Sequence, residues 1–227
     1  MQKTAFQQFV LGVRDELPIL LGVVPFGMIY GILALSAGLP AVEAQAMSAV
    51  IFAGSSQFMI VQLIGESTPW LVIVVTGFVI NLRHALYSAT IAPYVKHLPF
   101  RWKACLAYLL TDEAFAVSVL HYQQQGITRF GHWYFLGAGL ALWTAWQIST
   151  ALGVFLGAQV PQSWGLDFTL PLTFIALVVP ALKDRAGFVT ALTASLAALV
   201  FFNLPYKLGL IAAATLAVVV GMWVEAR

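Results

Sequence analysis

The sequence predicts an all-α, polytopic membrane protein. Hydrophobic residues make up 61% of the 227-residue chain, charged residues make up only 9%, and the mean hydropathy is +0.90. Soluble domains are about 45–50% apolar and about 25% charged, so this composition excludes an ordinary soluble fold. Several apolar stretches also reach about 18 residues or more, the length at which a helix crosses a bilayer.

Eight apolar segments follow one another along the chain, after a short lead-in. Residues 1–16 place apolar and polar side chains on opposite faces of a helix, which predicts a helix that lies on the membrane surface. The connections between segments are short, so we expect a single transmembrane domain over residues 1–227. The segments run approximately over residues 17–38, 44–64, 69–92, 101–120, 133–158, 168–182, 187–203 and 206–224.

Basic residues in the connections constrain the number of crossings. The positive-inside rule would place the N-terminus, "YVKHLPFRWK" at 94–103 and "KDR" at 183–185 all on the cytoplasmic side. Eight full crossings cannot satisfy this rule, because three crossings would separate the N-terminus from the first basic connection. We therefore predict about six full spans plus two broken or re-entrant segments. The alternative is seven or eight full transmembrane helices.

The second and sixth segments are the two that we expect to be broken. The second contains "FAGSSQF" over residues 52–58, where small and polar residues interrupt the apolar run and Gly54 marks the break. The sixth is short and contains Pro171 and Pro180. Irregular backbone at membrane depth is tolerated where it is buried in protein or lines a cavity.

This assignment gives both halves of the chain the same order of elements. Residues 17–120 and 133–224 each run as span, broken segment, span and span, and the two halves begin on opposite sides. That order predicts an inverted-topology repeat, in which paired broken segments point to a binding site near the midplane. Gly31 and Gly153 are separated by the same interval as two Asn-Leu pairs. The alternative is eight ordinary helices whose connections follow the charge rule poorly.

Charged residues within the third and fourth segments indicate a functional site. Arg83 and Asp112 lie equally far in sequence from the turn at 97–98, so their side chains should reach a similar depth, on the order of 15 Å. Because buried charges need partners, we expect Arg83 to pair with Asp112 or with Glu113. The second carboxylate would then be left to bind a proton or an ammonium group. A static ion pair that only joins two helices is the alternative.

Polar residues beside these charges are further candidates. His84 suits either a proton relay or a single hydrogen bond inside the bundle. Ser55, Ser56 and Gln57 bring hydroxyl and amide groups to the predicted break, where free backbone N–H and C=O groups can bind a carboxylate or a cation. The alternative is close helix packing with hydrogen-bonded serines.

Pro25 and Gly27 in the first segment predict either a hinge or a kink with a close helix contact.

Other functional classes find little support in the sequence. The net charge of +2 does not indicate nucleic-acid binding, Cys105 is alone, and the four histidines lack the spacing of a metal site. We see no phosphate-binding loop and expect no cofactor. A serine hydrolase could use Ser55 or Ser56 with His84 as base, but no oxyanion arrangement is recognisable, so we expect no enzyme. A passive channel or facilitator for small neutral solutes remains an alternative.

Four stretches in the chain together resemble one known family. They are "PFGMIYGILALSAGL", "IFAGSSQF", "NLRHALYSA" and "TDEAFA", in this order. With them the chain resembles the AzlC-type family, the large subunit of two-component branched-chain amino acid exporters. The resemblance implies export of valine, leucine, isoleucine and also methionine across the bacterial cytoplasmic (inner) membrane. It also implies a small AzlD-type membrane subunit as partner, and it is compatible with a higher oligomer.

The residues and the resemblance together predict a mechanism. Without a nucleotide-binding motif, we expect proton antiport, with His84, Asp112 and Glu113 as the coupling groups. The amino acid's carboxylate would meet Arg83 or the helix break, its ammonium group would meet an acid, and its side chain would lie among Phe26, Phe52 and Phe58. Alternating access would come from one half rocking against the other. The candidate substrate-binding residues are Ser55, Ser56, Gln57, Phe58, Asn81 and Arg83.

Overall fold

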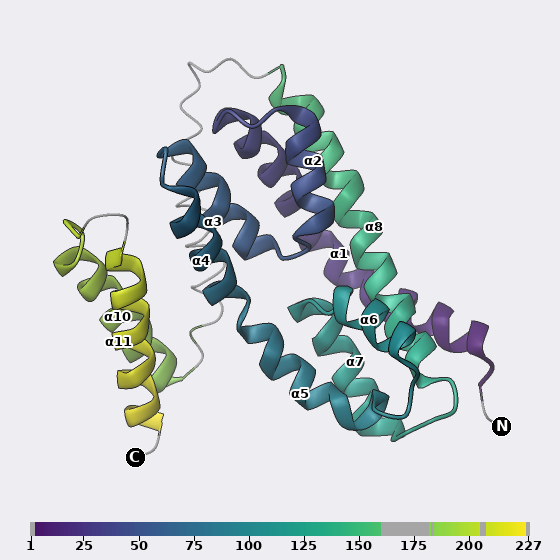
Figure 1. The fold of residues 1–227 in the computed structure, drawn as a ribbon. Coiled ribbons are helices and arrows are strands. Elements are labelled where there is room, and N and C mark those ends of the chain that lie inside the picture. The colour runs from purple at the N-terminus through teal and green to yellow at the C-terminus, as the bar shows by residue number, and fades with distance from the viewer. Residues whose placement is uncertain (1–2, 160–181, 183, 205–207, 226–227) are drawn as a thin grey trace. The chain divides into compact units, whose positions relative to one another are not determined.

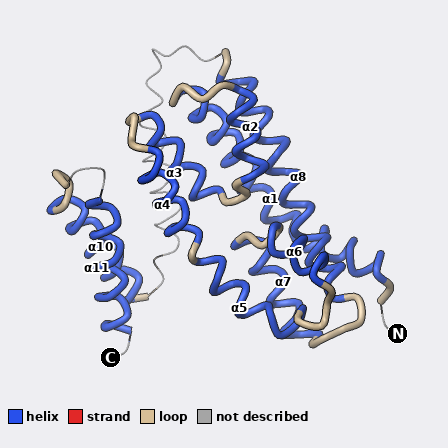
Figure 2. The backbone as a smooth tube through the Cα atoms, in the orientation of Figure 1, coloured by secondary structure: helices blue, strands red, loops and turns tan. Residues whose placement is uncertain are grey.

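The computed structural model describes residues 3–159, 182, 184–204 and 208–225. Every regular element within these residues is an α-helix (Figures 1 and 2). Four stretches of described helix are long and apolar enough to cross a membrane, which confirms the predicted all-α, polytopic membrane protein. They are Ala5–Ser36, Trp70–Val95, Gly131–Gly157 and Leu208–Glu225. The sixth predicted segment, with its expected break at Pro171, lies almost wholly outside the described residues.

The chain divides into two compact units. The first comprises residues 1–65 and 77–161, and the second comprises residues 66–76 and 162–227. Helix α4 (Trp70–Asn81) contributes residues to both units. The expectation of a single transmembrane domain stays a prediction.

Two long helices, α1 (Ala5–Ser36) and α8 (Gly131–Gly157), form the centre of the first unit (Figure 1). Glycines let their backbones approach closely, as small residues do between membrane helices. A side chain added at Gly12 would meet Tyr134, and one added at Gly31 would meet the backbone of Gly153. Because contacts advance along both helices together, α1 and α8 run parallel.

This parallel direction contradicts the predicted inverted-topology repeat. In such a repeat the first helix of one half runs opposite to the first helix of the other half. Here α1 and α8 are the first helices of the halves 17–120 and 133–224, and both begin at the same end of the unit. Gly31 and Gly153, whose spacing had suggested the repeat, instead face each other where the two helices pack closely.

Helix α1 is continuous from the lead-in through both of its prolines. Thr4 caps it with a reciprocal box, accepting from the Gln7 backbone N–H at 3.3 Å and donating to the Gln7 side chain at 2.9 Å. Residues 5–16 are therefore the first turns of α1. The helix does not break at Pro25, and Gly27 packs against Ser149 of α8. Gly27 thus fits the close helix contact among the two predicted alternatives.

The predicted break in the second segment is present. Helix α2 (Ala41–Val50) ends at Ile51, and helix α3 begins at Gly54 and runs to Gly65. A side chain at Gly54 would approach the Trp146 indole within 3.0 Å, so a glycine suits this position. Gly65 lies against Ala37, next to the end of α1. The chain therefore returns to the end of the unit from which α2 started.

The fourth segment is also broken, which corrects the prediction of a full span over 101–120. Helix α6 (Phe100–Tyr108) ends, and helix α7 (Asp112–Gln125) begins after residues 109–111. The physical reason is a new helix start within the segment. Thr111 accepts a hydrogen bond from the Ala114 backbone N–H at 3.3 Å, and two acidic residues occupy the first turn. Such residues favour a helix N-terminus over continuation of α6.

The α6–α7 pair returns to the end of the unit where it started. Tyr122, near the end of α7, stacks on Tyr94 near the end of helix α5 (Arg83–Val95), with ring centroids 4.9 Å apart. Trp102, near the start of α6, contacts Trp133 near the start of α8 at 5.2 Å.

Within the described residues of the first unit, the helical segments are interrupted at three places: at 51–53, at Leu82 between α4 and α5, and at 109–111.

In the second unit, helices α10 (Arg185–Val200) and α11 (Leu208–Glu225) form an antiparallel pair. Asp184 caps α10 by accepting from the Gly187 backbone N–H at 2.6 Å. Gly209 packs against Phe201, and Gly221 packs against Thr190. Small residues on α11 therefore permit this close packing.

Candidate functional site

Arg83 connects the starts of three helices. It is the first residue of α5, and its Nη2 donates to Ser55 Oγ, in the first turn of α3, at 2.8 Å. Its Nη1 donates to Oδ2 of Asp112, the first residue of α7, at 3.2 Å. Helix N-termini carry unpaired N–H groups and a partial positive charge. The expected pairing of Arg83 with Asp112 is therefore present, at a point that also favours anions.

The ion pair is only partly buried. The Arg83 side chain is 29% exposed and the Asp112 side chain is 46% exposed. Nε of Arg83 is buried and lacks a hydrogen-bond partner within the part of the chain that the structure describes. A guanidinium can donate five hydrogen bonds, so this one keeps capacity for another acceptor.

Asn81 and Ser56 join α3 to α4 beside the ion pair. Nδ2 of Asn81 donates to Ser56 Oγ at 3.3 Å, and Ser56 Oγ donates to the Gly77 carbonyl at 3.5 Å. Ser56 is fully buried, so its role is to hold these two helices together. Oδ1 of Asn81 is buried and unpaired among the described residues, which leaves an acceptor next to Arg83.

His84 follows Arg83 and is bonded locally. Its Nδ1 lies 3.1 Å from the Asn81 carbonyl oxygen, and its ring contacts Tyr87 edge-on at 5.8 Å. Tyr87 in turn stacks on Phe115 of α7 at 4.6 Å. This geometry agrees with the predicted hydrogen bond inside the bundle, and it tests no role in proton transfer.

The predicted aromatic residues divide between two places. Phe58 is 1% exposed and meets Phe26 and Tyr30 edge-on, with ring centroids 6.1 Å and 6.2 Å away. These three rings belong to the core between α1 and α3, where Gln57 is also fully buried beside Tyr30. Phe26 and Phe58 thus pack the scaffold behind the site.

Phe52 instead lies where two helix breaks meet. Its ring contacts Tyr108, the last residue of α6, at 6.2 Å. The Tyr108 hydroxyl donates to the Ala49 carbonyl at 2.6 Å and accepts from Nε1 of Trp143 at 2.7 Å. Tyr108 therefore ties the break after α2 to the break after α6. Sequence reasoning missed it, because a tyrosine in an apolar run carries no distinctive signal.

A polar ladder between α2 and α8 was also missed. Nε2 of Gln45 donates to Oε1 of Gln147 at 2.8 Å, and the Ser48 and Thr150 hydroxyls lie 3.0 Å apart. Nε2 of Gln147 donates to the Ser48 carbonyl at 3.1 Å. The available sequence signal was that two polar residues lie three positions apart on each helix, Gln45 and Ser48 on α2 and Gln147 and Thr150 on α8. The ladder anchors the short helix α2, so it supports the break that follows.

Glu16 is a further residue that the sequence did not single out. It is fully buried, with both carboxylate oxygens unpaired among the described residues. Gln8, Gly12 and Glu16 recur every four residues and form the buried stripe of the first turns of α1. Phe6, on the opposite face, is 74% exposed. The reading of residues 1–16 as a surface helix hid this stripe.

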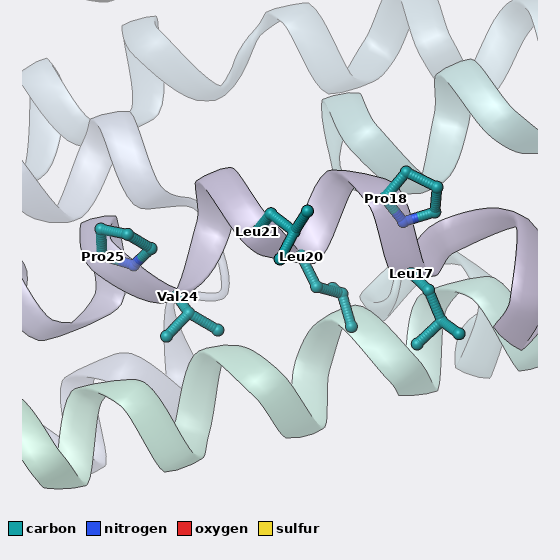
Figure 3. A pocket seen from close by; sticks show the side chains of 6 residues that line it. All are labelled: Leu17, Pro18, Leu20, Leu21, Val24 and Pro25. Atoms are coloured by element: carbon teal, nitrogen blue, oxygen red, sulfur yellow. The ribbon is translucent and has the colours of Figure 1, made fainter.

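An apolar hollow on α1 is separate from the ion pair. Figure 3 shows its lining, which comes entirely from one helix and contains no charged or hydrogen-bonding side chain. It therefore offers nothing to pair with a charged solute. The lining residues are Leu17, Pro18, Leu20, Leu21, Val24 and Pro25.

Metal-binding residues do not gather in the described part of the chain. No group of three or more histidine, cysteine, aspartate or glutamate side chains could hold an ion there.

Long apolar helices, together with helix breaks that surround an arginine–carboxylate pair, define a polytopic helical membrane protein with a polar site between its helices. The AzlC protein family model matches residues 18–160, which is more than half of the chain. The chain therefore belongs to the AzlC family. AzlC is a family of transporters and not a family of enzymes, so this chain is not an enzyme.

Similar proteins occur in bacteria and archaea. The inner membrane protein YgaZ of Escherichia coli is 25% identical over 95% of this chain and 91% of its own length. An uncharacterized membrane protein of Archaeoglobus fulgidus is 35% identical over 78% of this chain and 77% of its own. The branched-chain amino acid transport protein AzlC of Bacillus subtilis is 27% identical over 82% of this chain and 74% of its own. No solved structure matches the chain.

Proposed function

We propose that this chain is the large subunit of a secondary transporter that exports branched-chain amino acids, and also methionine, from the bacterial cytoplasm. Its membership of the AzlC family and its similarity to a branched-chain amino acid transport protein support the substrate class. The similarity to an inner membrane protein supports the cytoplasmic membrane as its location.

The observation that carries the proposal is the contact of Arg83 with Asp112 and Ser55. An amino acid presents a carboxylate and an ammonium group on one carbon atom, so its site needs both charges close together. Arg83 and Asp112 lie 3.2 Å apart and are partly exposed, which offers both charges at one point. The substrate's carboxylate would bind Arg83 and Ser55, and its ammonium group would bind Asp112.

The surroundings of the pair fit the rest of an aliphatic amino acid. The starts of α3 and α7 offer backbone N–H groups to the carboxylate. The aliphatic side chain would lie against Phe52 and Tyr108, whose rings stand at the neighbouring breaks. Burial of one methylene group stabilises by about 0.8 kcal/mol, so such a surface favours leucine over smaller amino acids.

Proton antiport follows from competition at the carboxylates. A proton on Asp112 or Glu113 removes the negative charge that an ammonium group needs, so proton and amino acid bind alternately. Exclusive binding of two solutes at one site is the condition for their exchange across a membrane. His84, one residue after Arg83, is the proposed route between these acids and the solvent.

A small AzlD-type membrane subunit is part of the proposed exporter, on the strength of the family resemblance. We expect transport by the purified large subunit to rise when that subunit is present in the same membrane.

The test is leucine counterflow in proteoliposomes that are preloaded with leucine and contain both subunits. Arg83→Ala removes hydrogen bonds to a charged group worth about 1.5–3 kcal/mol, which corresponds to roughly 10- to 150-fold weaker binding. We expect counterflow to fall by at least that factor. Arg129→Ala is the matched control, because Arg129 lies over the Phe130 ring in a connection and should not affect transport.

Two outcomes would contradict the proposal. Wild-type counterflow in Arg83→Ala would remove Arg83 from the site. Leucine flux that neither saturates nor exchanges would indicate a passive channel.

A further inference from the structure

A row of unpaired polar side chains lies between α1 and α7. Both oxygens of Glu16 are buried without a partner among the residues that the structure describes, and Glu16 is 0% exposed. Three further polar atoms buried on these helices also lack a described partner: Oε1 of Gln8, Oγ of Ser118 and Nε2 of His121. Burial of an unpaired carboxylate is costly, and a purely structural side chain at this position would be apolar.

This row leads toward the Arg83 site. The Glu16 and Glu113 carboxylates are close enough to interact electrostatically, and Glu113 directly follows Asp112. At the other end of the row, Lys3 and Asp15 are close enough to His121 to interact with it electrostatically. The distance along α7 from His121 to Glu113 is about 12 Å at 1.5 Å per residue. The row therefore runs from the end of the unit with the N-terminus to the ion pair.

The ionisable groups that interact with Glu16 are acidic or phenolic. Glu113 faces it from α7, Tyr134 of α8 is near enough to interact with it, and Asp15 precedes it on α1. The α3 helix carries no ionisable side chain, and the ionisable residue of α2, Glu43, is exposed near that helix's start. The charged partner that interacts with Glu16 is Glu113, which is also an acid, so a proton is the available means of neutralising Glu16.

We propose that Glu16 is a proton-binding site that relays protons between the His121 end of this row and Glu113. In the direction of antiport, the protonated Glu113 carboxyl group gives its proton to the Glu16 carboxylate, and Glu16 then gives that proton to the His121 side. No other bond forms or breaks. Buried polar atoms of this kind are the places that water molecules bridge. As a second proton route to the carboxylates, beside the one through His84, this relay rests on the proposed function.

Proton binding is tested first without any substrate. Infrared difference spectra of the purified full-length protein in lipid, recorded during a pH titration, report the carbonyl band of a buried protonated carboxyl group. We expect this band in the wild type and in Glu43→Gln, and its loss in Glu16→Gln. Identical spectra of Glu16→Gln and wild type would overturn the proposal. Because no leucine is present, this result stands even if the proposed transport fails.

Transport then tests the relay. Glu16→Gln keeps the shape of the side chain but cannot release a proton. We expect leucine counterflow at the wild-type rate, and uptake driven by a pH gradient reduced by roughly 100-fold, a contribution typical of a positioned acid–base group. An equal fall of both activities would indicate a structural role and overturn the relay. If Glu16→Gln does not fold, Glu113→Gln must shift the titration midpoint of the Glu16 band, and an unchanged midpoint overturns the proposal.

Discussion

Arg83 shows how one side chain can hold a membrane site together while leaving part of it free. Its two Nη atoms donate to groups on different helices, Ser55 at 2.8 Å and Asp112 at 3.2 Å. Its Nε remains unpaired within the described part of the chain. The planar fork of a guanidinium fits this arrangement, because its donors have fixed and separate directions.

Geometry as well as charge should therefore matter at this position. Arg83→Lys keeps the positive charge, but a compact ammonium group cannot reach both partners in the same way. We expect leucine counterflow to fall at least about tenfold, equivalent to about 1.4 kcal/mol, the order of one charge-assisted hydrogen bond. Arg101→Lys, at the exposed start of α6, is the control and should be neutral. Full activity of Arg83→Lys would show that only charge is required.

At the residue scale, the sequence predicted the Arg83–Asp112 pair but did not predict the buried polar residues around it, such as Glu16. Arg83 and Asp112 could be paired in advance, because a charge in an apolar segment needs a partner and helix geometry sets its depth. Glu16 could not, because an acid near the N-terminus reads equally well as a solvent-facing residue. Only the packing of α1 on α7 and α8 reveals which face is buried.

Helix breaks were predictable only where their chemistry interrupts the apolar pattern. The Gly-Ser-Ser-Gln stretch at 54–57 stands out, and α3 begins there. The break at 109–111 contains Leu109 and Leu110, so the apolar pattern continues into it, and only the Thr111 cap marks the new helix start. Helix direction was not predictable at all, since the spacing of Gly31 and Gly153 suits both a repeat and a parallel contact.

The α1–α8 contact should be sensitive to small increases in volume. A side chain at Gly31 would meet the backbone of Thr150, Gly153 and Val154, which cannot move aside easily. We expect Gly31→Ala to destabilise by about 1–3 kcal/mol, the usual range for overpacking, and to lower the melting temperature in detergent. Gly22 of the same helix has no atom within 4 Å of the added group.

Gly22→Ala is thus the matched control for this contact. It should stabilise by about 0.5–1 kcal/mol, because alanine suits a helix interior better than glycine. Equal melting temperatures of Gly22→Ala and Gly31→Ala would show that α1 and α8 do not pack as described.

At the scale of the whole first unit, the two hairpins decide where each connection lies. The α2–α3 pair leaves from the end of α1 and returns beside Ala37, while the α6–α7 pair returns beside Tyr94. Neither pair crosses the unit, so the N-terminus and the basic connection at 94–103 share one end. The positive-inside rule is then satisfied for these two basic regions without an inverted repeat.

Cysteine labelling in cells distinguishes this arrangement from eight full crossings. Cys105, the chain's single cysteine, is first replaced by serine. In that background we expect Ser36→Cys and Gly65→Cys to react with a membrane-impermeant maleimide in intact cells. His97→Cys and Gln124→Cys, at the opposite end of the unit, should react only after permeabilisation, because the positive-inside rule places that end in the cytoplasm. All four positions are exposed. If Gly65→Cys required permeabilisation while Ser36→Cys did not, the second segment would cross the membrane and the hairpin would be refuted.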